Sequence, residues 1–188
     1  MDIRDKIISA YQEMVITHGF YRVSMDALAA KSGVSKRTIY RYFQSKEELI
    51  EAVIDKMLLL VGGKIDRVLS EAGTPEEAIS GILNVLFSLG RGIINPLTIS
   101  DLRTHYPHFW KKIDDFRMKR INLLIQAILR QNSGERIRNI DPRILTALVL
   151  SSVQTILNPE FIVSNNLDFD EAVNQLVEIL KYGLLKED

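Results

Sequence analysis

The stretch SMDALAAKSGVSKRTIYRYFQSK, residues 24–46, decides the fold of this chain. Its pattern predicts two short helices joined by a tight turn. Ala29 is small enough to let the two helices approach each other, and Gly33 can adopt the left-handed conformation that the turn demands. Ser35 can then cap the start of the second helix. The apolar seam between the helices is expected to contain Leu28, Val34 and Ile39.

The second of these helices has two different faces. On a helical wheel, Ile39 and Phe43 point inward, with Tyr42 close by, whereas the outer face carries Lys36, Arg37, Tyr40 and Arg41. A basic and aromatic outer face is unsuited to packing and suited to a DNA groove. The stretch is therefore predicted to be a helix-turn-helix whose second helix enters DNA.

A wider set of motifs over residues 5–55 resembles the N-terminal domain of the TetR family, the bacterial one-component transcriptional repressors. The motifs are Ile7 with Ala10, Gly19 with Phe20, Leu28 with Ala29, residues 33–35 (GVS), residues 38–43 (TIYRYF) and residues 45–49 (SKEEL). They cover about a quarter of the chain, and the remainder resembles the family only in length and helical pattern. Three positions depart from the family's pattern, namely Tyr11, Val23 and Arg37. Because of these departures, the resemblance does not predict the operator sequence.

The resemblance implies roles for six polar residues of the motif. Lys36, Arg37 and Tyr40 would approach base edges, while the phosphates would be contacted by Ser24, Tyr42 and Lys46. The chemistry agrees, because arginine can bind guanine through two hydrogen bonds, and lysine and helix N-terminal amides suit phosphate oxygens. Tyr42 can equally be explained as seam packing, and both serines as N-caps. The predicted DNA-binding set is Ser24, Ser35, Lys36, Arg37, Thr38, Tyr40, Arg41, Tyr42 and Lys46.

The charge of the chain is unevenly distributed. The 188 residues carry no formal net charge, yet residues 22–46 hold six basic side chains and one acidic one, Asp26. This segment is therefore net +5 and the remainder is net −5. A basic N-terminal module on an acidic body is expected where only one end meets phosphate, and a merely solvated basic patch is the alternative.

Several classes of protein are disfavoured by composition. The chain has no cysteine, which excludes disulfides and thiolate metal sites. The N-terminus has no signal-peptide pattern and the longest uncharged run, residues 144–158, is too short to cross a membrane, so we expect a cytoplasmic protein. His105 and His108 are separated by Pro107 and have no third ligand nearby. The sequence also shows no arrangement of residues typical of a catalytic site. We therefore expect no metal, no cofactor and no enzymatic activity.

The rest of the chain reads as helices separated by proline, glycine and capping signals. We predict an all-α protein of about nine helices, at residues 3–19, 25–32, 36–43, 46–70, 75–94, 97–105, 107–132, 142–164 and 169–185. The domain boundary is expected at the start of the fourth helix. Residues 1–46 would form the DNA-binding domain, and residues 47–188 the helical domain that binds an effector and dimerises.

The last two long helices are predicted to dimerise. Residues 144–157 contain nine apolar residues and no charge, and the final helix carries an apolar stripe at three-four spacing. Pairing across a two-fold axis into a four-helix bundle explains both patterns, and the TetR resemblance implies the same interface. The alternative is that both helices simply pack within one subunit. The predicted interface consists of Leu148, Ser152, Ile156, Val173, Leu176 and Leu180.

A cavity for an unidentified small-molecule effector in the middle helices is implied by the resemblance. Its predicted lining is Phe87, Arg91, Arg103, Tyr106, Trp110, Gln126 and Gln154, although the aromatic members also suit an ordinary core. The sequence thus predicts a homodimeric, ligand-responsive repressor of a pseudo-palindromic DNA operator. The alternative is a helical ligand-binding or enzymatic bundle whose helix-turn-helix has no DNA function, and an activator would share every feature.

Overall fold

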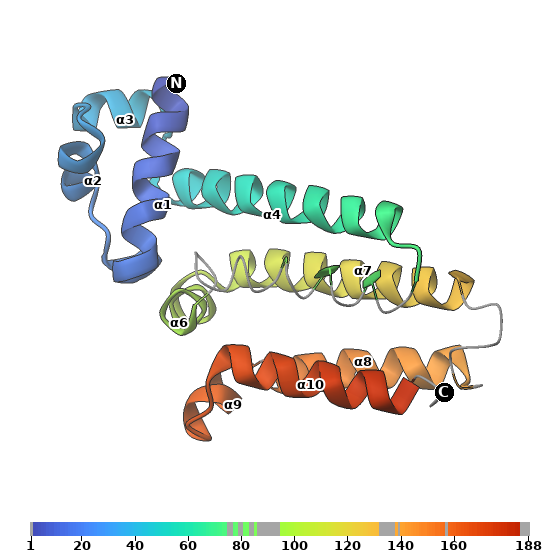
Figure 1. Cartoon of the computed structure of the whole chain (residues 1–188). Helices are drawn as coiled ribbons and strands as arrows, with labels where there is room; N and C mark the ends of the chain where they lie inside the picture. Colours follow the sequence, from blue (N-terminus) through green and yellow to red (C-terminus); the bar gives the residue numbers. More distant parts are fainter. Residues whose placement is uncertain are drawn as a thin grey trace. The chain divides into compact units, whose positions relative to one another are not determined.

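The computed structural model describes residues 2–74, 77–78, 81–82, 85, 95–131, 138, 140–156 and 158–184. All regular structure in this part of the chain is helical, which confirms the all-α prediction. The described helices (Figure 1) are α1 (Ile3–Arg22), α2 (Met25–Ser32), α3 (Lys36–Tyr42), α4 (Lys46–Glu71), α6 (Pro96–His105), α7 (Pro107–Gln131), α8 (Pro142–Ile156), α9 (Pro159–Ser164) and α10 (Phe169–Leu184).

The prediction of a single helix at residues 142–164 is wrong. The structure has two helices there, because α8 ends at Ile156 and α9 begins at Pro159. Proline has no amide hydrogen to donate and disfavours helical geometry in the residue before it, so it starts a new helix instead of continuing the old one. Most of the predicted helix at residues 75–94 lies outside the described residues. None of the described helices is long and apolar enough to cross a membrane.

By packing, the chain divides into two compact units. The first is Met1–Val61 with Leu89–Asp114, and the second is Gly62–Ser88 with Asp115–Asp188. The first unit extends beyond the segment 1–46 because the first half of α4, the helix α6 and the start of α7 belong to it. The functional division that we expect at residues 46–47 stays a prediction.

The core of the first unit is built on the helix-turn-helix. Leu28 and Ile39 of the predicted seam are fully buried, and so is Phe43. Gly33 has φ +66° and donates its N–H to the carbonyl of Ala29, so it ends α2 in the left-handed conformation that the sequence predicts.

Tyr11 fills the position where the family resemblance suggests a small residue. It is fully buried, and its hydroxyl donates a hydrogen bond to the Phe20 carbonyl at 3.1 Å. Burial is the main reason that the pKa of this hydroxyl is raised above its ordinary value. The side chain therefore links the middle of α1 to its far end.

The end of α1 is held by side chains of α6. Gly19 interrupts the helical geometry with φ +77° and ψ 170°. Beyond it, the N–H of Tyr21 donates to a carboxylate oxygen of Asp101 at 2.9 Å, and the Tyr21 ring stacks on His105 with 3.8 Å between centroids. The side-chain amide of Asn95, the N-cap of α6, donates to the Ile16 carbonyl at 3.1 Å. These contacts bind the C-terminal turn of α1 to α6 in place of the missing helical hydrogen bonds.

The second unit contains α8, α9, α10 and most of α7. Its core is made by Ile125, Leu145 and Val149, against which Leu180 of α10 and Val153 of α8 pack. The α8 and α10 helices lie side by side (Figure 1).

Candidate DNA-binding surface and apolar pocket

Both short helices of the helix-turn-helix begin with a serine cap. The Ser24 hydroxyl accepts the N–H of Ala27 at 3.1 Å, and the Ser35 hydroxyl accepts the N–H of Thr38 at 3.0 Å. The Ser35 and Thr38 hydroxyls also bond to each other at 2.8 Å. These contacts confirm the predicted caps, and they place both serines at helix N-termini, where backbone amides can meet an anion.

The predicted outer face of α3 is exposed. Lys36, Arg37, Tyr40 and Arg41 all reach solvent, whereas Ile39 behind them is fully buried. The Arg41 guanidinium lies 5.4 Å from the centre of the Tyr42 ring, which is half-buried. Three cations and a phenol thus project from one short helix whose other side is anchored in the core.

Among the exposed residues of α3, Lys36 forms an intramolecular ion pair. Its ammonium donates to a carboxylate oxygen of Asp26, on α2, at 2.9 Å. The hydrogen bond with Asp26 raises the pKa of the lysine above its ordinary value, so Lys36 stays protonated near neutral pH. No ion pair joins Arg37 or Arg41 to any residue that the structure describes.

Lys46, the first residue of α4, is more enclosed than sequence reasoning suggests. Its ammonium donates to the Tyr21 carbonyl at 2.7 Å and lies 6.0 Å from the centre of the Tyr21 ring. Burial lowers the pKa of this ammonium, with an opposing contribution from Asp101. The phosphate contact stays a prediction, and the structure adds a second role: Lys46 ties the start of α4 to the end of α1.

Arg4 lies near α3, and sequence reasoning missed it. Its guanidinium lies 5.3 Å from the centre of the Phe43 ring, at the end of α3. The sequence shows Arg4 only as one of several charges at the start of the first helix. Its position beside Phe43 depends on how α1 crosses α3, which no local pattern encodes.

The predicted effector-binding residues fall into separate parts of the structure. Phe87 and Arg91 lie outside the described residues. In the first unit, the Arg103 guanidinium lies 5.8 Å from the centre of the Trp110 ring, and Tyr106 is buried beside Phe109. Burial raises the pKa of the Tyr106 hydroxyl. In the second unit, Gln126 and Gln154 are exposed, and Gln154 donates to the sulfur of Met118 at 3.6 Å.

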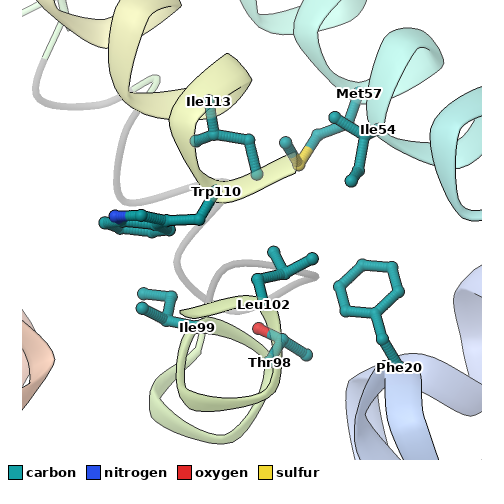
Figure 2. A pocket seen from close by; sticks show the side chains of 8 residues that line it. All are labelled: Phe20, Ile54, Met57, Thr98, Ile99, Leu102, Trp110 and Ile113. Carbon is teal, nitrogen blue, oxygen red and sulfur yellow. The ribbon is translucent and has the colours of Figure 1, made fainter. Parts of the chain in front are cut away.

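Of the predicted effector residues that the structure describes, Trp110 alone lines a small apolar pocket in the first unit. Figure 2 shows the side chains that surround it, from α1, α4, α6 and α7: Phe20, Ile54, Met57, Thr98, Ile99, Leu102, Trp110 and Ile113. The hydroxyl of Thr98 is already bonded to the backbone of Asn95 at 3.0 Å. The free space is about 10 Å³, enough for roughly one water molecule. The pocket is therefore lined almost entirely by apolar groups and is nearly filled by them.

Among the residues that the structure describes, no group of three histidine, aspartate or glutamate side chains is placed to hold a metal ion. The polar groups that gather in the first unit are instead the helix caps, the cations of α3 and the contacts that hold the end of α1.

Comparisons with known proteins agree with this geometry. Residues 7–53 match the family model described as "Bacterial regulatory proteins, tetR family". The chain is 30% identical to the nucleoid occlusion factor SlmA of Vibrio campbellii, over 89% of this chain and 90% of that protein. It is 25% identical to the uncharacterized HTH-type transcriptional regulator YvaF of Bacillus subtilis, over 98% of this chain and 97% of that protein.

Solved structures share the fold over the whole length. The regulator FadR of Bacillus subtilis in complex with stearoyl-CoA has a TM-score of 0.70 and 17% identity, over 95% of this chain and 98% of that chain. These matches favour a DNA-binding transcriptional regulator over a helical bundle whose helix-turn-helix has no DNA function. The chain belongs to the TetR family of bacterial transcriptional regulators.

Proposed function

We propose that this regulator is a homodimeric repressor that inserts α3 of each subunit into one half-site of a pseudo-palindromic operator and releases it when a small molecule binds. The observation that carries the proposal is the exposed face of α3. Its cations project away from a fully buried Ile39, so a rigid core fixes their positions. Base edges in the major groove are read by such fixed donors.

Arg37 is the residue that we assign to base reading. It is exposed on the first turn of α3 and has no ion-pair partner in the part of the chain that the structure describes, so its fork of donors is available to a guanine. Replacing Arg37 with alanine should cost about 1–3 kcal/mol of operator binding per half-site and relax discrimination at one base pair of each half-site. The operator is first obtained by in vitro selection from random DNA, which also tests its two-fold symmetry.

The measurement is a set of binding titrations against the operator and its single-base variants. Arg67→Ala is the matched control, because Arg67 is an exposed arginine of α4 that pairs with Glu71 in the second unit. This control should retain the base preferences of the wild type. A uniform loss of affinity in Arg37→Ala, with unchanged base preferences, would make Arg37 a phosphate contact. Selection that enriches no sequence at all would refute the proposed function.

Dimerisation is assigned to exposed apolar residues of α8 and α10. Of the predicted interface, Leu148 is 51% exposed, but Val173 and Leu176 are buried inside the subunit and Leu180 packs in its core. Ser152 and Ile156 are half-buried. The interface proposed from the structure therefore keeps Leu148 and adds Ile144, Ile179 and Tyr182, which are 63%, 67% and 73% exposed.

The effector is proposed to carry an apolar group. Support comes from the lining of the pocket beside Trp110, which offers apolar walls and a hydroxyl that is already bonded. A molecule that entered would have to push the walls apart, and one wall is α6, which holds the end of α1 through Asp101. Effector binding is thereby linked to the position of the DNA-binding helices. The solved structure of the FadR neighbour holds stearoyl-CoA, which makes this compound a reasonable probe.

Stearoyl-CoA is expected to raise the melting temperature of the protein, to change the fluorescence of Trp110 and to weaken operator binding. Reciprocal coupling of about 1–3 kcal/mol is typical of such switches. Coenzyme A without the acyl chain is the matched control and should have none of these effects. If stearoyl-CoA stabilised the protein but left operator affinity unchanged throughout a titration, it would not be an inducer, and the link from pocket to DNA would fail for this ligand.

A further inference from the structure

We propose that Asp26 is a specificity-determining residue, which binds the ammonium of Lys36 and withholds its charge from DNA phosphates. The proposal rests on the proposed function, in which α3 reads DNA. Asp26 lies on α2 and Lys36 opens α3, and their side chains meet at 2.9 Å although they are ten positions apart in the sequence. Both side chains are exposed, and so is Arg37, which follows Lys36 on the first turn of α3.

The distribution of charge sets Asp26 apart. It is the only acidic residue among residues 22–46, which carry six cations. The first turn of α3 has no acidic residue of its own, and its first residue is a cation placed at the positive end of the helix. A lysine is disfavoured there, because the exposed backbone amides already carry partial positive charge. The carboxylate of Asp26 supplies the missing counter-charge from the neighbouring helix.

This pairing has opposite effects on the two kinds of DNA binding. Attraction to any DNA sequence depends on the number of cations that neutralise phosphates and release counterions. A lysine already neutralised by Asp26 contributes little to that attraction. Its ammonium still has two further N–H groups, which can donate to base acceptors while Asp26 holds it in place. Asp26 therefore lowers affinity for random DNA more than affinity for the operator.

The test is the substitution Asp26→Asn, which keeps the size of the side chain and removes its charge. Binding to a random-sequence duplex should tighten by about 2- to 20-fold, and the slope of log affinity against log salt should steepen by about one unit per subunit. Affinity for the operator should rise less, so that the ratio of specific to random binding falls. Asp26→Glu keeps the charge and should retain the wild-type ratio.

Two controls separate this role from net charge and from stability. Glu13→Gln removes the same charge from an exposed pair of similar length, with Lys31 at 3.0 Å, but leaves Lys36 untouched. It should not change the specificity ratio. In a Lys36→Ala background, Asp26→Asn should have no further effect, because its partner is absent. Asp26→Ser, which retains a residue suited to the start of a helix, should reproduce Asp26→Asn if the asparagine variant has a lowered melting temperature.

Each outcome bears on one proposal. If the wild-type protein distinguishes its operator but Asp26→Asn leaves the ratio and the salt slope unchanged, the role of Asp26 is refuted while the proposed function stands. Equal effects of Asp26→Asn and Glu13→Gln, or an undiminished effect without Lys36, would also refute it. A wild-type protein that binds every sequence alike would refute the proposed function itself.

Discussion

Gly19→Ala is expected to destabilise the protein by about 3 kcal/mol or more. Gly19 has φ +77° and ψ 170°, a conformation that is essentially restricted to glycine. A Cβ at this position would also overlap a carboxylate oxygen of Asp101. The carboxylate would have to move away from the N–H of Tyr21, which would then lose its hydrogen-bond partner. Strain and the lost bond to a charged group act together.

Urea unfolding followed by circular dichroism measures this change. Gly63→Ala is the matched control, because Gly63 lies within α4, is exposed, and an added Cβ there would meet nothing within 4 Å. Alanine favours a helix interior, so the control should be more stable than the wild type by about 0.5–1 kcal/mol. A Gly19→Ala variant with the unfolding midpoint of the wild type would contradict the backbone conformation and the contact with Asp101.

Leu148→Glu is expected to convert the proposed dimer into a folded monomer that no longer binds its operator tightly. In the interface, each glutamate would be an unpaired charge in an apolar surface, at a cost of several kcal/mol per subunit. Within one subunit the side chain is 51% exposed, so the monomer can solvate the glutamate and remain folded. By contrast, Leu176→Glu would place a charge in the core of the subunit and unfold it, because Leu176 is buried.

Sedimentation velocity gives the oligomeric state, and thermal unfolding reports whether the fold survives. Leu59→Glu is the control, because Leu59 is an exposed leucine of α4 that lies outside the proposed interface. It should sediment as the wild type does. Ile179→Glu on α10 should behave like Leu148→Glu. If the wild type is monomeric at tens of micromolar (a concentration chosen for the test), or if Leu148→Glu remains a dimer, the proposed interface is wrong.

The local features of the helix-turn-helix were predictable because their causes are local. The backbone freedom of Gly33, the capping hydroxyl of Ser35 and the spacing of Leu28 and Ile39 act within a few residues, and the structure bears each of them out. The helical pattern of most of the other described segments was predictable for the same reason. The sequence does signal the helix break at Pro159 through the asparagine-proline pair. The long apolar run beside this pair favours one continuous helix and so hides the signal.

Contacts between helices were not predictable from one sequence. An apolar stripe shows that a helix buries one face, but it does not tell which neighbour covers that face. The stripe therefore predicts that Val173 and Leu176 face a partner subunit, whereas the structure buries both within their own subunit. The four helices that meet at the apolar pocket are equally non-local.

The division between sequence and tertiary structure is clearest at the DNA-binding surface. By itself, the sequence determined that α3 presents Lys36, Arg37, Tyr40 and Arg41 on one face, because helical periodicity alone sets which side chains share a face. Only the tertiary structure decided which of these cations is already paired. The crossing of α2 and α3 brings Asp26 to Lys36, and the approach of α1 to α4 brings the Tyr21 carbonyl to Lys46. Such pairs depend on crossing geometry, which is set by packing over the whole unit and has no short-range signature in the chain.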